Sequence, residues 1–233
     1  MTVVLMCVRI FAGEIHAKDP QPAAWWNFDE GEGAVVKDKT GHVEDAQLKS
    51  RDGNGLPAWI TTPWGKGLGF HPGTYIQAPA GKALLLTEVF TIESRVCMNY
   101  SREKARTVLA RGGEGTKKLY WLRYHTGWTS WVFAFGNGGQ VDFLGAKHYP
   151  NPGQWYHVAV TFDKGRVIFY LDGMAVEEKK SGIERIETPA TDDLFIGAYA
   201  AFGHGLNGSI AEVKLFDAAL SPEQIKREFE NEK

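Results

Sequence analysis

Residues 155–173 constrain the fold more than any other stretch, because they predict two β-strands joined by a tight turn. Large hydrophobic side chains alternate along 155–162 and again along 167–171, with the period of two that a pleated strand imposes. The turn falls at residues 163–165, where Gly165 can adopt a positive φ. Large groups occupy both faces of each strand, so we expect this hairpin to lie inside a sheet that is stacked on another layer.

Short strand-like runs separated by Gly, Asn, Asp and Pro recur between residues 24 and 216, and they suggest about fourteen strands. One helix closes the chain, with Ser221 as its N-cap, Pro222 as its first residue and Gln224 completing a capping box. This order predicts an all-β fold: a two-sheet antiparallel β-sandwich of jelly-roll type with one short C-terminal helix.

Outside the hairpin, the run 89–97 alternates most clearly. We expect one of its faces to be buried and the other, which carries Glu93 and Arg95, to be in water. In the last strand, Ile210 and Glu212 are two residues apart, so we expect them to share a side.

The length of 233 residues suits a single sandwich domain, which we assign to residues 23–233. The formal net charge is −2, and the sequence has no cluster of Lys and Arg that would form a basic face. Nucleic acid is therefore not expected as a partner.

Residues 1–22 are interpreted as a signal peptide or a disordered N-terminus, since a short apolar run ends at Ala17 before a polar segment. The first interpretation predicts a secreted, cell-surface or periplasmic protein, and the second a cytoplasmic one. The apolar run is too short to span a bilayer. Cys7 and Cys97 can pair only if the first residues stay in the mature protein, and otherwise both are free or buried thiols.

Strand and turn motifs follow one another in a characteristic order along the chain. They occupy residues 25–31, 38–41, 67–70, 90–92, 155–161, 170–173, 195–197, 208–213 and 219–221. From residue 23 onwards, this order closely resembles the laminin-G-like jelly-roll domains of the concanavalin A-like lectin/glucanase superfamily. The resemblance implies a concave sheet and rim loops that hold a ligand. It does not fix the ligand, because members bind glycans, bind proteins or accompany enzymes.

The resemblance also implies a Ca²⁺ ion on the convex side, held by an early acidic residue and by an acidic pair in the last strand. Asp29 fits the role of the early acidic residue, and Glu212 is one of the two acidic residues expected in the last strand. Ala211 stands where the family commonly has Asp, and the loss of one carboxylate weakens a Ca²⁺ site. The alternative is that Asp29 and Glu212 are turn and surface carboxylates.

Catalysis is not expected. The resemblance implies that related glucanases place acidic residues at alternate positions of one strand, so that both carboxylates project into a cleft. No strand of this sequence has that pattern, and no other catalytic motif occurs. His157 belongs to the central hairpin, and we interpret it as a packing residue.

The best candidate ligand site lies in the run 119–125, where Trp121, Arg123 and His125 share one face. Trp128 on the following turn could join them. Sugars stack on aromatic rings and accept hydrogen bonds from polar side chains nearby, so this face suits a glycan. The alternative is that Trp121 is a core residue and Arg123 an ordinary surface charge.

These observations predict a non-catalytic carbohydrate-binding or adhesion module, stabilised by calcium, whose partner is a polysaccharide or glycoconjugate. The alternative is a structural or protein–protein interaction domain without a glycan site. The third hypothesis, after these two, is a glycoside hydrolase or lyase.

Overall fold

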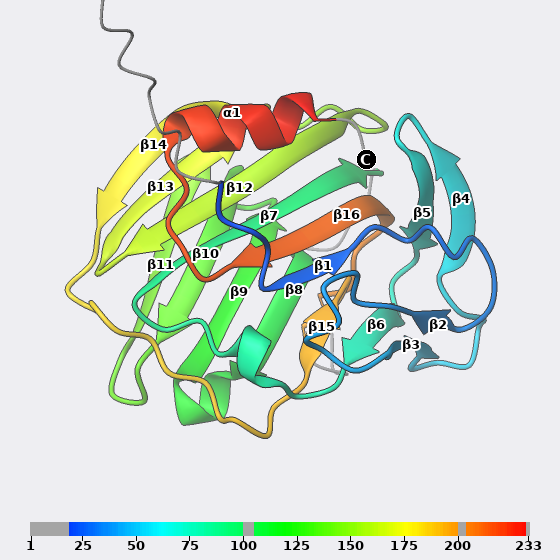
Figure 1. Cartoon of the computed structure of the whole chain (residues 1–233), viewed down its shortest axis with the longest axis horizontal. Coiled ribbons are helices and arrows are strands. Elements are labelled where there is room, and N and C mark those ends of the chain that lie inside the picture. The colour runs from blue at the N-terminus through cyan, green and yellow to red at the C-terminus, as the bar shows by residue number, and fades with distance from the viewer. Residues whose placement is uncertain (1–18, 100–104, 200–203, 232–233) are drawn as a thin grey trace, which may run out of the picture.

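Sixteen strands form two antiparallel sheets that stack face to face in the computed structural model, which describes residues 19–99, 105–199 and 204–231 (Figure 1). The predicted all-β sandwich with one short C-terminal helix is confirmed. The candidate signal peptide, with Cys7, lies almost entirely outside the described residues. None of the helices in the described part is long and apolar enough to cross a membrane.

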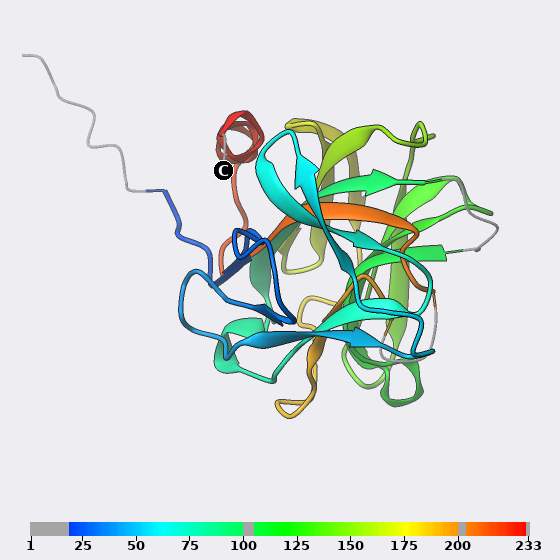
Figure 2. The ribbon, with the colours of Figure 1, turned by 90° about the vertical axis from the view of Figure 1, so that its right-hand side faces the viewer.

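One sheet, which we call the helix-side sheet, carries the helix on its outer face (Figure 2). Its strands are β1 (Ala24–Trp26), β4 (Ala58–Thr62), β5 (Gly65–Phe70), β7 (Val89–Met98), β12 (Trp155–Asp163), β13 (Arg166–Leu171), β14 (Met174–Lys180) and β16 (Gly208–Phe216).

The other sheet, which we call the far sheet, lies on the opposite side of the core from the helix (Figure 2). Its strands are β2 (Val35–Val36), β3 (Ala46–Ser50), β6 (Thr74–Ala78), β8 (Ala105–Gly113), β9 (Lys118–His125), β10 (Ser130–Gly136), β11 (Val141–Lys147) and β15 (Leu194–Ile196). Two 3₁₀ helices, η1 (Lys82–Leu84) and η2 (Glu114–Thr116), connect strands, and α1 (Pro222–Glu230) follows the last strand.

The central hairpin is confirmed as β12 and β13, and both of its faces are buried apart from the strand ends and the half-buried Ile168. Its turn places Lys164 at φ 46° and Gly165 at φ 86°, the left-handed pair of a two-residue hairpin loop. On its inner side, Phe162 stacks on Phe90 with ring centroids 4.9 Å apart. The hairpin therefore supplies one wall of the core between the sheets.

Strand β7 corrects the expectation of a wet face, because Glu93 and Arg95 are both buried. The helix α1 covers this part of the sheet. The Arg95 guanidinium donates hydrogen bonds of 2.8–2.9 Å to the backbone carbonyls of Glu228, Phe229 and Asn231 at the C-terminus of α1. A cation there also meets the negative end of the helix dipole.

Strand β16 corrects a second expectation. Its register with β7 shifts between Ile210 and Glu212, so that Ala211 is an extra residue and the two flanking side chains lie on opposite sides of the sheet. Ile210 is in the core between the sheets, whereas Glu212 lies beside Arg95 on the outer face.

The helix α1 begins as predicted, with the full capping box at Ser221 and Gln224. Ile225 packs against Ala159 and Tyr170 on the outer face of the helix-side sheet. Beneath the helix, Lys214 Nζ lies 2.7 Å from a Glu228 carboxylate oxygen and 3.6 Å from one of Glu93. Glu93, Arg95, Glu212, Lys214 and Glu228 thus form one charge cluster that fastens the helix to the sheet.

The interpretation of His157 as a packing residue agrees with its burial, and its Nε2 lies 3.5 Å from Glu93 Oε2. Burial alone would raise the pKa of Glu93, but the contact with His157 and the charges of Lys214 and Arg95 outweigh burial and lower that pKa. Glu93 is therefore held as a carboxylate in the folded protein.

Candidate functional site

Strand β9 presents the predicted candidate residues on the outer face of the far sheet. Tyr120, Leu122 and Tyr124 point into the core between the sheets, so Trp121 and Arg123, which alternate with them, point away from it. His125 continues this outer face at the end of the strand, and Trp128 follows on the turn to β10.

Trp121 is covered even though it lies outside the main core. The residue is 1% exposed, and the rings of Phe143 and Tyr199 contact its ring edge-on at centroid distances of 5.6 and 6.2 Å. The Arg123 guanidinium lies 3.7 Å from the centroid of the Trp121 ring and is itself mostly buried. In this conformation the Trp121 ring is covered by Arg123, Phe143 and Tyr199 and offers no open face to a sugar.

Trp128 is the exposed member of the predicted set. Its side chain is 51% exposed, and its ring stacks on His125 with centroids 4.4 Å apart and an interplanar angle of 27°. The Trp128 backbone N–H donates to His125 Nδ1 at 3.1 Å. The turn therefore fixes one face of the indole on the imidazole and leaves part of the indole open to solvent.

Tyr149 completes this end of the sheet and was not identified from the sequence. Its side chain is 74% exposed, and the neighbouring His148 N–H donates to the Thr129 carbonyl at 3.0 Å. The Tyr124 hydroxyl donates to the His148 carbonyl at 3.1 Å, which ties the same segment to β9. We call His125, Trp128 and Tyr149 the aromatic rim. The signal that the sequence offered was Tyr149 beside Pro150 in a polar loop.

Asp29 and Glu212, the residues proposed to bind calcium, share no partner among the residues that the structure describes. Asp29 accepts a hydrogen bond from Asn27 and lies 3.8 Å from Lys39 Nζ. The Glu212 carboxylate accepts from Trp25 Nε1 at 2.7 Å and lies 3.4 Å from both Arg95 Nε and Lys214 Nζ.

Two cations already balance Glu212, and Ca²⁺ requires six to eight oxygen ligands, so the pair as arranged does not fit a shared calcium site. The described residues include no group of three or more His, Cys, Asp and Glu arranged to hold a metal.

We therefore expect EDTA to leave the melting temperature of the protein, measured by calorimetry, unchanged. Adding 1 mM CaCl₂, which is about ten times the Kd of a weak calcium site, should raise that temperature by less than about 1 °C. A fall of several degrees with EDTA, reversed by Ca²⁺, would contradict this.

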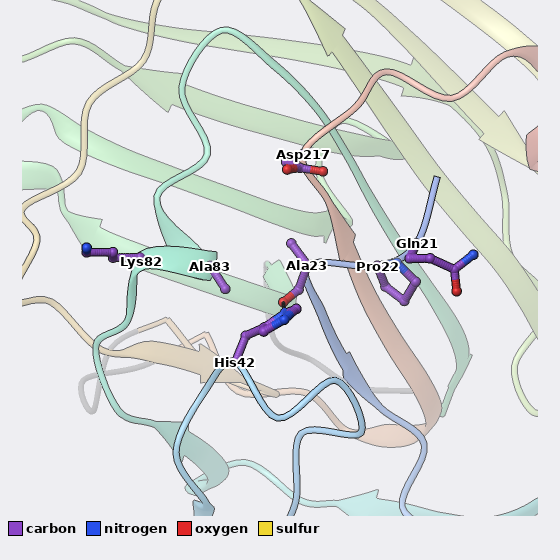
Figure 3. Close-up of a pocket in the computed structure, with 7 residues that line it drawn as sticks. All are labelled: Gln21, Pro22, Ala23, His42, Lys82, Ala83 and Asp217. Atoms are coloured by element: carbon purple, nitrogen blue, oxygen red, sulfur yellow. Dashed lines mark hydrogen bonds between the residues drawn. The ribbon is translucent and has the colours of Figure 1, made fainter. Parts of the chain in front are cut away.

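A pocket of about 520 Å³ lies away from the aromatic rim, where β1, η1 and the segments around His42 and Asp217 meet (Figure 3). Its lining consists of Gln21, Pro22, Ala23, His42, Lys82, Ala83 and Asp217. His42 Nδ1 is 3.1 Å from the Ala23 carbonyl oxygen and so must carry the proton of that hydrogen bond. The lining has no Trp, Tyr or Phe ring on which a sugar could stack, so the rim is the stronger candidate.

A laminin-G family model, described as the concanavalin A-like lectin/glucanases superfamily, matches residues 70–226. The chain belongs to this superfamily. The resemblance that the sequence motifs suggested is therefore confirmed.

Solved structures share the fold at low sequence identity. Domain 4 of AbnA, an extracellular GH43 arabinanase from Geobacillus stearothermophilus determined in complex with arabinotriose, is 19% identical, with a TM-score of 0.70 over 90% of this chain and 98% of that domain. The binding domain of botulinum neurotoxin serotype G is 11% identical, with a TM-score of 0.69 over 90% of this chain and 50% of the other. Trypanosoma rangeli sialidase is 18% identical, with a TM-score of 0.63 over 88% of this chain and 32% of the other.

Proposed function

We propose that this protein is a non-catalytic carbohydrate-binding module that holds its glycan at the aromatic rim of the far sheet. The observation that carries the proposal is Trp128, which is half exposed yet fixed by its stack on His125. A rigid ring loses little conformational entropy when a sugar stacks on it. The arabinotriose complex of the similar arabinanase domain supports carbohydrate as the ligand class.

The proposed absence of catalysis rests on where the carboxylates lie. Glycoside hydrolysis needs two carboxyl groups that both reach the sugar. Glu93 and Glu212 approach the same ammonium group of Lys214, but both are buried and lie on the outer face of the helix-side sheet rather than at the rim. Asp142 is the acidic residue on the far-sheet strands, and it accepts a hydrogen bond from Ser181.

Affinity electrophoresis tests the proposal directly. The purified chain is run through native gels that contain one soluble polysaccharide each, and its mobility is compared with that in a gel without polysaccharide. We expect retardation by at least one polysaccharide, with no release of reducing sugar after prolonged incubation. Unchanged mobility on every polysaccharide, together with a blank glycan array, would favour the alternative of a structural or protein-interaction domain. Release of reducing sugar would contradict the non-catalytic assignment.

A further inference from the structure

The two sheets differ in charge. Among the described residues, the far-sheet strands carry six Lys or Arg residues and one acidic residue. The helix-side strands carry six Lys or Arg residues and five acidic residues. On the far sheet these are Lys49, Arg106, Arg111, Lys118, Arg123 and Lys147, against Asp142. Because the whole chain has a net charge of −2, positive charge is concentrated on the sheet that carries the proposed glycan site.

Three of these cations belong to the outer face. Lys49, Arg123 and Lys147 alternate with the core residues Leu48, Leu122 and Ala146. The other three cations already have partners within the protein. The Arg106 guanidinium lies over the Tyr124 ring. Arg111 donates hydrogen bonds to the carbonyls of Asp192 and Pro189, and Lys118 forms an ion pair with Glu187 at 2.9 Å. Asp142 pairs in register with Phe135, which points into the core.

The outer cations lie along the rim end of the sheet. Ser130 of β10 pairs in register with Lys147 of β11 on one side and with His125 of β9 on the other. Lys147 is therefore two strands away from His125, on which Trp128 stacks. Lys49 pairs with Tyr75 on the other half of the sheet, six strand spacings from β11, or roughly 29 Å. Such a separation suits a polymer rather than a single sugar.

Lys49 and Lys147 are exposed, and neither has an ion-pair partner among the described residues. Among the described residues, no outward-facing strand position of the far sheet carries a carboxylate. The Asp193 carboxylate lies just before β15, where it accepts hydrogen bonds from the Gln77 side chain and the Ala80 backbone N–H. A ligand that bears regularly spaced negative charges would therefore meet more attraction than repulsion along these strands.

From this charge pattern we propose that the ligand of the far sheet is an anionic polysaccharide, with carboxylate or sulfate groups that pair with Lys147 and Lys49 while a sugar ring stacks on Trp128. The proposal rests on the carbohydrate site proposed above and narrows its ligand to one chemical class.

The test compares four soluble probes in affinity electrophoresis: hyaluronan for carboxylates, dextran sulfate for sulfates, and neutral arabinan and dextran. The test variant is Lys49→Gln with Lys147→Gln. The matched control is Lys164→Gln with Lys180→Gln, which removes the same charge from exposed positions of the helix-side sheet. Circular dichroism checks that both variants are folded.

We expect hyaluronan or dextran sulfate to retard the wild-type chain about tenfold more strongly than either neutral glycan. Whichever of these two polymers retards the chain more strongly identifies the anionic group as carboxylate or sulfate. The test variant should lose about tenfold of the affinity for that polymer, and the control less than twofold. Raising the salt from 50 to 500 mM should remove most of the difference, because exposed charges are then screened.

Equal retardation by neutral and anionic polysaccharides, unaffected by salt or by the two substitutions, would overturn the anionic ligand and leave the carbohydrate site standing. If none of the four probes and no other glycan retards the chain, both proposals are overturned. Single-stranded DNA is the last control: if it binds as tightly as the anionic polysaccharide and Trp128→Ala does not weaken either, the surface is a general polyanion site and the proposal fails.

Discussion

Replacing Arg95 by Met is expected to lower the free energy of unfolding by about 3–5 kcal/mol. The substitution leaves Glu212 in the charge cluster without one of its two cations, and it removes the three hydrogen bonds that close the C-terminus of α1. For a domain of this size the loss corresponds to a fall in melting temperature of roughly 6–20 °C. Urea denaturation followed by tryptophan fluorescence measures the change.

Arg166→Met is the matched control, because Arg166 also forms an ion pair, with Glu178 at 2.8 Å, but on the exposed edge of the helix-side sheet. Solvent screens this pair, so its loss should cost about 1 kcal/mol or less. Equal effects of the two substitutions would mean that Arg95 acts as an ordinary surface charge and that α1 is held by its apolar contacts alone.

Trp128→Ala is expected to weaken binding of the best polysaccharide by about 30-fold or more, which corresponds to the loss of at least about 2 kcal/mol that truncating an aromatic anchor causes. Because Trp128 is half exposed and lies on a turn, the free energy of unfolding should change by less than about 1 kcal/mol. Affinity electrophoresis gives the first quantity, and urea denaturation gives the second.

Met174→Ala is the control for this experiment. Met174 is 68% exposed, more than Trp128, but it lies on edge strand β14 of the helix-side sheet. We expect unchanged polysaccharide binding. A Trp128→Ala protein that binds as well as the wild type would remove the aromatic rim as the site, and equal losses in both variants would point to non-specific adsorption through exposed apolar groups.

Much of the fold follows from patterns that the sequence carries locally. The alternation in 155–171 predicts the hairpin, and Ser221 with Gln224 predicts the beginning of α1, because each pattern reflects the backbone geometry of a few neighbouring residues. The same alternation correctly assigns Trp121, Arg123 and His125 to the outer face of β9.

Local patterns mislead where the fold departs from a regular strand or where a distant segment covers a face. Glu93 and Arg95 were expected in water because their strand alternates, but α1, more than a hundred residues later, covers that face. Glu212 was expected beside Ile210 because a regular strand has no bulge, and Ala211 breaks the register. The calcium role implied for Glu212 is opposed by Lys214, two residues along the same strand, and by Arg95, which only the packed sheet brings to it.

Local spacing in the sequence predicts which side of a regular strand a residue takes, how the hairpin turn closes and where the helix begins, and it fails at the bulge of β16. What lies over each side depends on the packed fold: Phe143 and Tyr199 cover Trp121, whereas Trp128 and Tyr149 stay open at the rim. The physical reason is that exposure depends on contacts between segments far apart in the chain, and a local period contains no information about those contacts.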